Sequence, residues 1–291
     1  MSVGATVSFH GVRGSTPCAG DRYERYGGNT SCVSLEADDH DPVILDLGTG
    51  LRPYGEQLET EGRADGFRGS VLLTHLHWDH VQGLPFFGPL SYPGSSIDVY
   101  GPAQPDASFG TVFGEVMKPP FFPIRSEQLS GAVRFHDAGN DDFPVDGAKV
   151  RSRWVRHTSP TLGFRVDLNG VSVAYLSDHG PGCSADPDDF VPRDVLDLCD
   201  GVDLLIHDAQ HTCGEYETHR HFGHSTVDYA VHVARESGAQ RLALFHHCPS
   251  HSDSDVDRLL LHAGDLAARR GVAEVIAAAE GLQLTLGVAH P

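Results

Sequence analysis

Four residues with metal-binding side chains lie within six positions of each other. The apolar run Val71–Thr74 leads directly into them: His75, His77, Asp79 and His80. Side chains alternate in an extended chain, so His75 and His77 point to one side and can hold one ion together. Asp79 and His80 follow where the chain turns, and they can face a second ion. A polar loop with incidental histidines is the alternative interpretation, but the spacing favours a metal site.

Four ligands on one loop do not complete two coordination shells, so partners must come from elsewhere. Three further residues of ligand type each follow a β-type run: His157, Asp178 and His246. Because α/β-type folds place their ligands at strand ends, we expect these residues to meet the first group. His247 is adjacent to His246, and the residues alone leave open which of the two is the ligand.

The elements that must position these residues are mostly short β-type runs. Eleven are visible, at 7–10, 32–35, 43–47, 71–74, 97–100, 150–155, 162–168, 171–176, 203–207, 241–245 and 282–288. Asn169-Gly170 between two of them is a hairpin signal. Helical periodicity is clear at 226–236 and 255–270. Many strands with interspersed helices indicate two sheets with helices outside.

The chain shows no linker, repeat or low-complexity segment, so we expect a single domain over residues 1–291. The stretch 101–146, which is rich in Pro, Gly and Phe, is a candidate lid or insertion, or else a packed surface loop. No apolar run approaches the ~20 residues that a membrane span needs. Six cysteines without paired spacing predict free thiols and a cytoplasmic location.

The charge balance bears on the partners. Twenty-one basic side chains stand against 40 acidic ones, which gives a net charge of −19, and there are 19 histidines. Binding to nucleic-acid backbones or to anionic membranes needs a basic surface. We therefore expect neither a membrane nor a large nucleic acid among the partners.

These motifs together resemble the metallo-β-lactamase-fold hydrolases, through His75-x-His77-x-Asp79-His80 and the later His157, Asp178 and His246. Within that superfamily the chain is most similar to the phosphodiesterase branch, which includes the tRNA 3′-processing endonucleases and the phosphoribosyl cyclic phosphodiesterases. The branch markers are GVRGSTP at 11–17, GGNTS at 27–31, LDLGTG at 45–50, HDA at 207–209 and GHST at 223–226. The resemblance spans residues 7 to 287 approximately.

The resemblance implies a four-layer αββα sandwich of two mixed sheets with outer helices, and two divalent metal ions at one edge of the sheets. It assigns His75, His77 and His157 to the first ion. It assigns Asp79, His80 and His246 to the second, with Asp178 bridging both. Ligands of this kind without a thiolate suit Zn²⁺, while Mn²⁺, Fe and Ni²⁺ remain open.

The resemblance also implies the catalytic residues, which are Asp79, His224 and Asp208. Asp208 occupies the acidic position of a His-acid-Ala motif, where the branch usually has Glu, and would orient His224. His224 would then act as general acid or phosphate clamp beside a helix start; a plain hydrogen-bonding role at that helix start is the alternative. Asp46 is read as the partner that holds a ligand imidazole in one tautomer, or as a turn-forming residue.

The expected function is a dinuclear metal-dependent phosphodiesterase that acts on a small cyclic or linear phosphodiester through attack by metal-bound hydroxide. The alternatives are a lactone, thioester or β-lactam hydrolase in the same fold, or a non-hydrolytic metal-binding accessory protein. Arg13 is a candidate for substrate contact. The histidines at 207, 211, 219 and 221 form either an additional metal site or a solvated polar loop. The oligomeric state is left open, with a homodimer as one candidate because the tRNA-processing branch is often dimeric.

Overall fold

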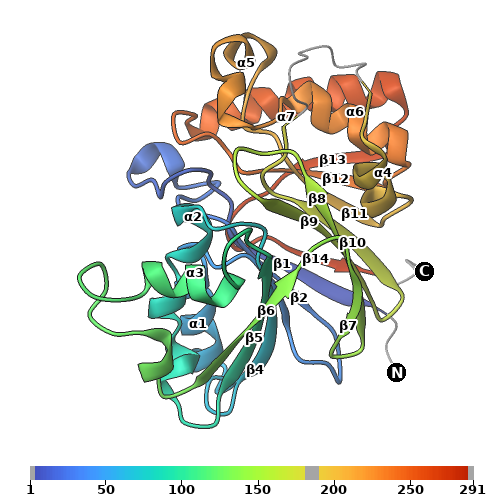
Figure 1. Cartoon of the computed structure of the whole chain (residues 1–291). Coiled ribbons are helices and arrows are strands. Elements are labelled where there is room, and N and C mark those ends of the chain that lie inside the picture. The colour runs from blue at the N-terminus through green and yellow to red at the C-terminus, as the bar shows by residue number, and fades with distance from the viewer. Residues whose placement is uncertain (1–3, 181–189, 288–291) are drawn as a thin grey trace.

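Two seven-stranded sheets pack face to face, and helices cover both outer faces (Figure 1). The structure, a computed structural model, describes residues 4–180 and 190–287. The predicted four-layer αββα sandwich is confirmed. Among the helices described, none is long and apolar enough to cross a membrane.

The first sheet is built mainly from the N-terminal half of the chain. Its strands lie in the order β14 (Gln283–Leu286), β1 (Ala5–Gly11), β2 (Cys32–Glu36), β3 (Val43–Leu45), β4 (Arg68–Leu72), β5 (Ser96–Pro102) and β6 (Ala132–Ala138). The pairs from β3 to β6 are parallel, whereas those from β14 to β3 are antiparallel. The sheet is therefore mixed.

The second sheet is built from the C-terminal half. Its strands lie in the order β13 (Glu274–Ala277), β12 (Arg241–Phe245), β11 (Leu204–Asp208), β10 (Val171–Leu176), β9 (Thr161–Leu168), β8 (Ala148–Val155) and β7 (Asp142–Val145). The predicted hairpin joins β9 to β10, with φ of 50° at Asn169 and 81° at Gly170. Positive φ at both central residues gives a turn whose twist matches that of the flanking strands.

Seven α-helices flank the two sheets in the described residues: α1 (Leu51–Thr60), α2 (Trp78–Val81), α3 (Phe109–Val116), α4 (Arg193–Cys199), α5 (Cys213–His219), α6 (Val227–Ser237) and α7 (Asp253–Arg270). The helices α1 and α3 contact the first sheet, and α4, α6 and α7 contact the second (Figure 1). One apolar core lies between the sheets and includes Phe9, Phe164 and Phe245. Each outer helical layer has its own core. Close packing in these three cores fixes the position of the sheet edge at which the candidate site lies.

The segment 101–146 contributes regular structure to the sandwich. It includes α3 and β6, and β6 pairs with β5 over seven residues as an edge strand of the first sheet. Part of this segment therefore completes the first sheet and its helical layer. Whether residues 101–146 act as a lid or insertion, or as a packed surface loop, stays a prediction.

Candidate metal centre

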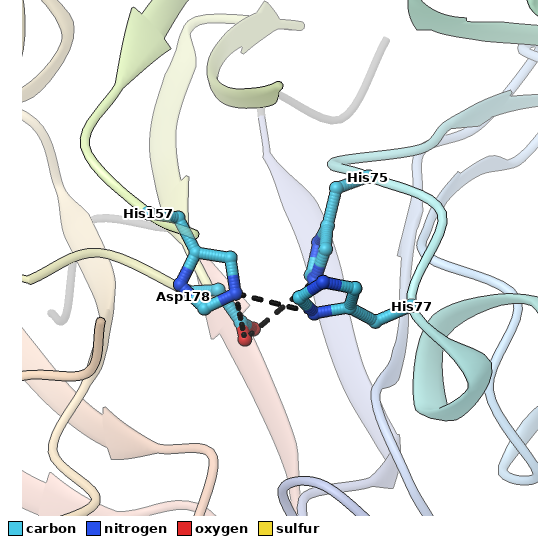
Figure 2. A group of neighbouring side chains, drawn as sticks. All are labelled: His75, His77, His157 and Asp178. Carbon is cyan, nitrogen blue, oxygen red and sulfur yellow. Dashed lines mark hydrogen bonds and ion pairs between the residues drawn. The ribbon is translucent and has the colours of Figure 1, made fainter. Parts of the chain in front are cut away.

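The predicted ligands meet at one edge of the two sheets. His75 and His77 follow β4, His157 follows β8, Asp178 follows β10 and His246 follows β12. Figure 2 shows the side chains of His75 and His77, from one segment, pointing toward those of His157 and Asp178 from two others. Segments of the two sheets that are far apart in the sequence thus contribute to one cluster of side chains.

The first group consists of His75, His77, His157 and Asp178, whose ligand atoms all lie within 4.8 Å of one another. His77 Nδ1 is 3.2 Å from His157 Nε2. Asp178 Oδ2 is 3.5 Å from His157 Nε2 and 3.7 Å from His75 Nε2. Three imidazoles and one carboxylate oxygen therefore surround a space of the size of one ion.

The second group consists of Asp79, His80 and His246. Asp79 Oδ2 lies 3.1 Å from Nε2 of each histidine. The other oxygen of Asp178, Oδ1, is 3.1 Å from His80 Nε2 and 3.2 Å from His246 Nε2. Asp178 therefore turns one oxygen to each group, which is the geometry that a bridging ligand needs.

These residues fit a pair of divalent cations. Nε2 of His75 is buried and has no hydrogen-bond partner in the described residues. A buried polar atom without a partner costs about 1–3 kcal/mol, a cost that coordination would remove. Imidazole and carboxylate donors without a thiolate suit Zn²⁺ and its neighbours in the first transition row.

The protonation of the first group also favours coordination. Burial, reinforced by neighbouring imidazoles, lowers the pKa of His75 well below its usual value. Burial and nearby histidines likewise lower the pKa of His77, and burial is the leading cause of the lowered pKa of His157. The rings are therefore neutral at physiological pH and have a free lone pair, as a metal ligand requires.

Four of the five ligand imidazoles are oriented through their second ring nitrogen, as is usual for metal-binding histidines. The contacts are His75 Nδ1 with Thr74 Oγ1 at 3.0 Å, His80 Nδ1 with Asp46 Oδ2 at 2.8 Å, His157 Nδ1 with Gly223 O at 2.9 Å, and His246 Nδ1 with Gln210 Nε2 at 3.4 Å. Sequence reasoning identified only Asp46 among these partners.

Asp46 lies fully buried behind His80 and is itself tightly held. Its carboxylate accepts hydrogen bonds from Thr74 N at 2.7 Å, from Thr74 Oγ1 at 3.0 Å and from Tyr175 OH at 2.9 Å. The geometry favours the predicted orienting role over that of a plain turn residue. Tyr175 reaches Asp46 from the second sheet, so the orienting network spans both sheets.

Backbone strain is concentrated at this edge. Six non-glycine residues in the described chain have positive φ, and three of them belong to the site: Ser15 at 62°, Asp46 at 62° and His246 at 58°. Ser15 N donates to Asp79 Oδ2 at 2.7 Å. Such conformations persist only where the surroundings enforce them, and they cluster at functional sites.

The GVRGSTP segment, residues 11–17, packs closely against the candidate site. A Cβ atom on Gly14 would lie 2.4 Å from His246 Nδ1, so this position has no room for a side chain. Arg13 is fully buried and donates to Gly27 O at 2.8 Å and to His251 O at 2.9 Å. Arg13 therefore ties loops together, and the expectation that it contacts substrate fails because solvent cannot reach it.

His224 and Asp208 lie beside the second group. His224 Nδ1 is 2.8 Å from Asp208 Oδ2 and 3.6 Å from Asp178 Oδ2. Burial opposes charge on His224, but the carboxylates of Asp208, Asp178 and Asp79 together outweigh it and raise the pKa of His224 to about 9. His224 also lines the cavity of about 680 Å³ in front of the metal ligands. The arrangement can present a proton to a group bound there.

The remaining candidate histidines have different places. His247 turns away from the cluster and donates from Nε2 to Ala278 O at 2.8 Å, so His246 is the one that points into the site. His207 is buried 3.2 Å from His179, while His211 and His219 line the metal cavity. In the two described ranges, none of the histidines at 207, 211, 219 and 221 joins a group that can hold an ion.

Comparisons with known proteins find relatives over most of the chain. Residues 59–247 match the model of the beta-lactamase superfamily domain. Ribonuclease Z of Lactococcus lactis subsp. lactis is 28% identical over 75% of this chain and 83% of its own length. Ribonuclease Z of Natronomonas pharaonis is 26% identical over 82% of this chain and 86% of its own. These relatives bear out a metal-dependent hydrolase of the phosphodiesterase type.

Solved structures show the same fold. Human tRNase Z, short form, has a TM-score of 0.67 at 21% identity and covers 97% of this chain and 100% of its own. A diphosphatase of the PhnP family has a TM-score of 0.67 at 22% identity, over 96% of this chain and 97% of its own. YhfI of Bacillus subtilis has a TM-score of 0.68 at 17% identity, over 97% and 99%.

One expectation is overturned by these relatives. The net charge of −19 predicts that a large nucleic acid is not a partner, yet relatives over most of the chain are ribonucleases by name. The expectation is wrong because net charge averages over the whole surface. Exposed charges act over only about 8 Å at physiological ionic strength, so the local field at the site decides what binds there.

Proposed function

Because the chain belongs to the beta-lactamase superfamily, we propose that it is a dinuclear metal hydrolase that cleaves a phosphodiester bond of RNA, with a tRNA as the leading substrate. Relatives named Ribonuclease Z over 75% and 84% of the chain support the choice of RNA. One observation carries the chemistry: Asp178 faces both ligand groups with different oxygens, and the His224–Asp208 pair lies next to it.

The residues that would hold the metals follow from the two groups. We assign His75, His77 and His157 to one ion, Asp79, His80 and His246 to the other, and Asp178 to both. When bound, two divalent ions supply Lewis acidity toward the phosphate and a water of lowered pKa. Zinc is our first choice of metal because of the donor set.

His224 is proposed to hold and deliver a proton. Asp208 occupies Nδ1 and stabilises the charged imidazolium, which leaves Nε2 as the donor atom. Departure of an RNA hydroxyl requires a proton, and a positioned acid contributes typically 10²–10⁴-fold. His224 would also attract a phosphate oxygen before the bond breaks.

The test is cleavage of a labelled tRNA precursor that carries a 3′ extension, by protein reconstituted with Zn²⁺ or Mn²⁺. We expect site-specific cleavage that chelation abolishes and metal restores. The same preparation is assayed on bis(p-nitrophenyl) phosphate and on lactone, thioester and β-lactam probes. Turnover of one of those probes without cleavage of any RNA would contradict the proposal. Two bound metals without any turnover would favour a non-hydrolytic protein instead.

A further inference from the structure

A second cavity, of about 490 Å³, lies beside the metal centre and is walled by aromatic side chains. It is formed by α2, the 3₁₀ turn that follows it, and the end of α3 with the loop after it. The aromatic residues that line it are Trp78, Phe86, Phe113, Phe121 and Phe122. None of these residues belongs to the ligand groups.

Three of these rings are unusually exposed for large apolar side chains. Trp78 is 60% exposed, Phe86 60% and Phe121 72%. Phe86 meets Phe122 edge to face at 6.0 Å between ring centroids. A cluster of exposed aromatic surface around one cavity marks a binding site, because leaving such surface in water is unfavourable.

The aromatic cavity adjoins the metal cavity through one residue. Trp78 stands between His77 and Asp79 in the sequence and lines both cavities. A group seated among the aromatic rings is therefore next to any phosphate held at the ligands. This continuity favours part of the same substrate over an unrelated ligand.

The polar groups of the cavity fit a nucleotide. The carboxamide of Gln82 lines the cavity and makes no hydrogen bond within the described residues, so it can read a base edge. Arg52, whose side chain is 69% exposed and pairs with the exposed Glu56 at 3.0 Å, also lines the cavity and can meet a backbone phosphate. Flat aromatic faces accept any base by stacking, as in proteins that bind single strands.

We propose that this aromatic cavity takes an unpaired nucleotide next to the scissile phosphodiester, with its base stacked on Phe86 or Phe121, beside Trp78. The inference rests on the proposed RNA cleavage and names a specificity determinant for it. Loss of stacking should raise KM and leave kcat unchanged, because stacking holds the substrate without contacting the reacting bond.

The experiment compares an RNA hairpin with a single-stranded 3′ extension against versions that lack one base on either side of the cleaved bond. For the wild-type enzyme we expect loss of one base to raise KM about 5- to 100-fold. In the Phe86→Ala/Phe121→Ala double variant the intact RNA should have the raised KM, and removal of the base should add little. Such non-additivity identifies the pair that interacts.

Leu261→Ala is the matched control, because Leu261 is a 71% exposed apolar residue on α7 outside both cavities. It should retain the full effect of base removal. Phe86→Leu/Phe121→Leu keeps apolar volume without rings and serves if the alanine variant fails to fold, as judged by thermal unfolding and metal content. The comparison of intact with abasic RNA on the wild-type enzyme needs no variant at all.

The outcomes separate the two proposals. If the enzyme cleaves RNA, but intact and abasic substrates have the same KM, the inference is overturned while the proposed function stands. If no RNA is cleaved, both proposals are contradicted.

A further readout is the fluorescence of Trp78, which is the one remaining tryptophan in the Trp154→Phe variant because the chain has only two. Non-hydrolysable intact RNA should quench its fluorescence, and quenching that is equal with abasic RNA would contradict stacking.

Discussion

At the scale of single residues, the proposed proton delivery by His224 can be tested separately from metal binding. His224→Ala should lower kcat for RNA about 10²- to 10⁴-fold, because a positioned acid is lost while all seven proposed ligands remain. Metal content, measured by elemental analysis, should stay near two ions per chain. Asp208→Asn should have a smaller effect, since the ring keeps a hydrogen-bond partner but loses the charge that favours its protonation.

The control for this pair is His262→Ala, at a half-exposed histidine on α7 that contacts Asp228. It should leave both kcat and metal content unchanged. Equal losses of metal and of activity in His224→Ala would show that His224 supports the ligands instead of acting on the substrate.

A second prediction at this scale concerns His10, which is buried, lies 2.8 Å from Ser34 Oγ and stacks on Tyr54 at 4.3 Å. Burial lowers the pKa of His10 to about 4. Between pH 6.5 and 4 the unfolded chain therefore takes up a proton that the folded chain refuses. His10 thus removes up to about 3 kcal/mol of stability as the pH falls through that range.

Urea unfolding at several pH values measures this effect. His10→Gln should flatten the loss of stability between pH 6.5 and 4, whereas His262→Gln should keep the wild-type slope. Identical slopes in all three proteins would mean that His10 is not the group that titrates.

The ligand residues could be predicted from sequence because their types and strand-end positions are local signals. Their orienting partners could not. Tyr175 reaches Asp46 across 129 positions of sequence, and Ser15 holds Asp79 through a backbone N–H that any residue type possesses. A hydroxyl or amide that meets a ligand only in the folded state leaves no spacing to recognise.

At the scale of elements, α7 begins with a reciprocal cap. Ser252 Oγ accepts from Asp255 N at 3.3 Å, and Asp255 accepts from Ser252 N at 2.7 Å. Ser252→Ala should destabilise the protein by about 1 kcal/mol, because helix-terminal N–H groups lose their partner. Ser254→Ala, two residues further at an exposed position, is the control. A loss in Ser254→Ala as large as in Ser252→Ala, measured by denaturant unfolding, would argue against the cap.

Most long strands and the two long helices could be predicted because they carry clear periodicity. Three strands could not: β6, β7 and β13 are edge or near-edge elements, and β7 and β13 have four residues each. Short helices such as α4, with seven residues, bury only part of one face. Their structure depends on tertiary packing more than on local propensity.

At the scale of the whole molecule, the net charge of −19 should affect how the proposed RNA substrate binds. If only the cations near the site contact its phosphates, a plot of log kcat/KM against log salt should fall with a slope shallower than about −2. Screening of repulsion between the acidic surface and RNA acts in the opposite direction. Cleavage rates from about 50 to 300 mM salt measure this slope. A slope steeper than about −4 would instead require an extended basic interface.

The strand order has a consequence for how the protein is made. β14, near the end of the described chain, pairs with β1 through Ala5–Leu286 and the three register pairs beside it. During synthesis, β1 therefore lacks its partner strand β14, which is made nearly 280 residues later. Until then the nascent chain presents an open strand edge, the kind of surface that recruits wrong partners. Deletion of residues 283–291 removes β14 and should leave the first sheet with an unpaired edge at β1. We expect this variant to aggregate during or soon after synthesis, although its sequence still contains every proposed metal ligand.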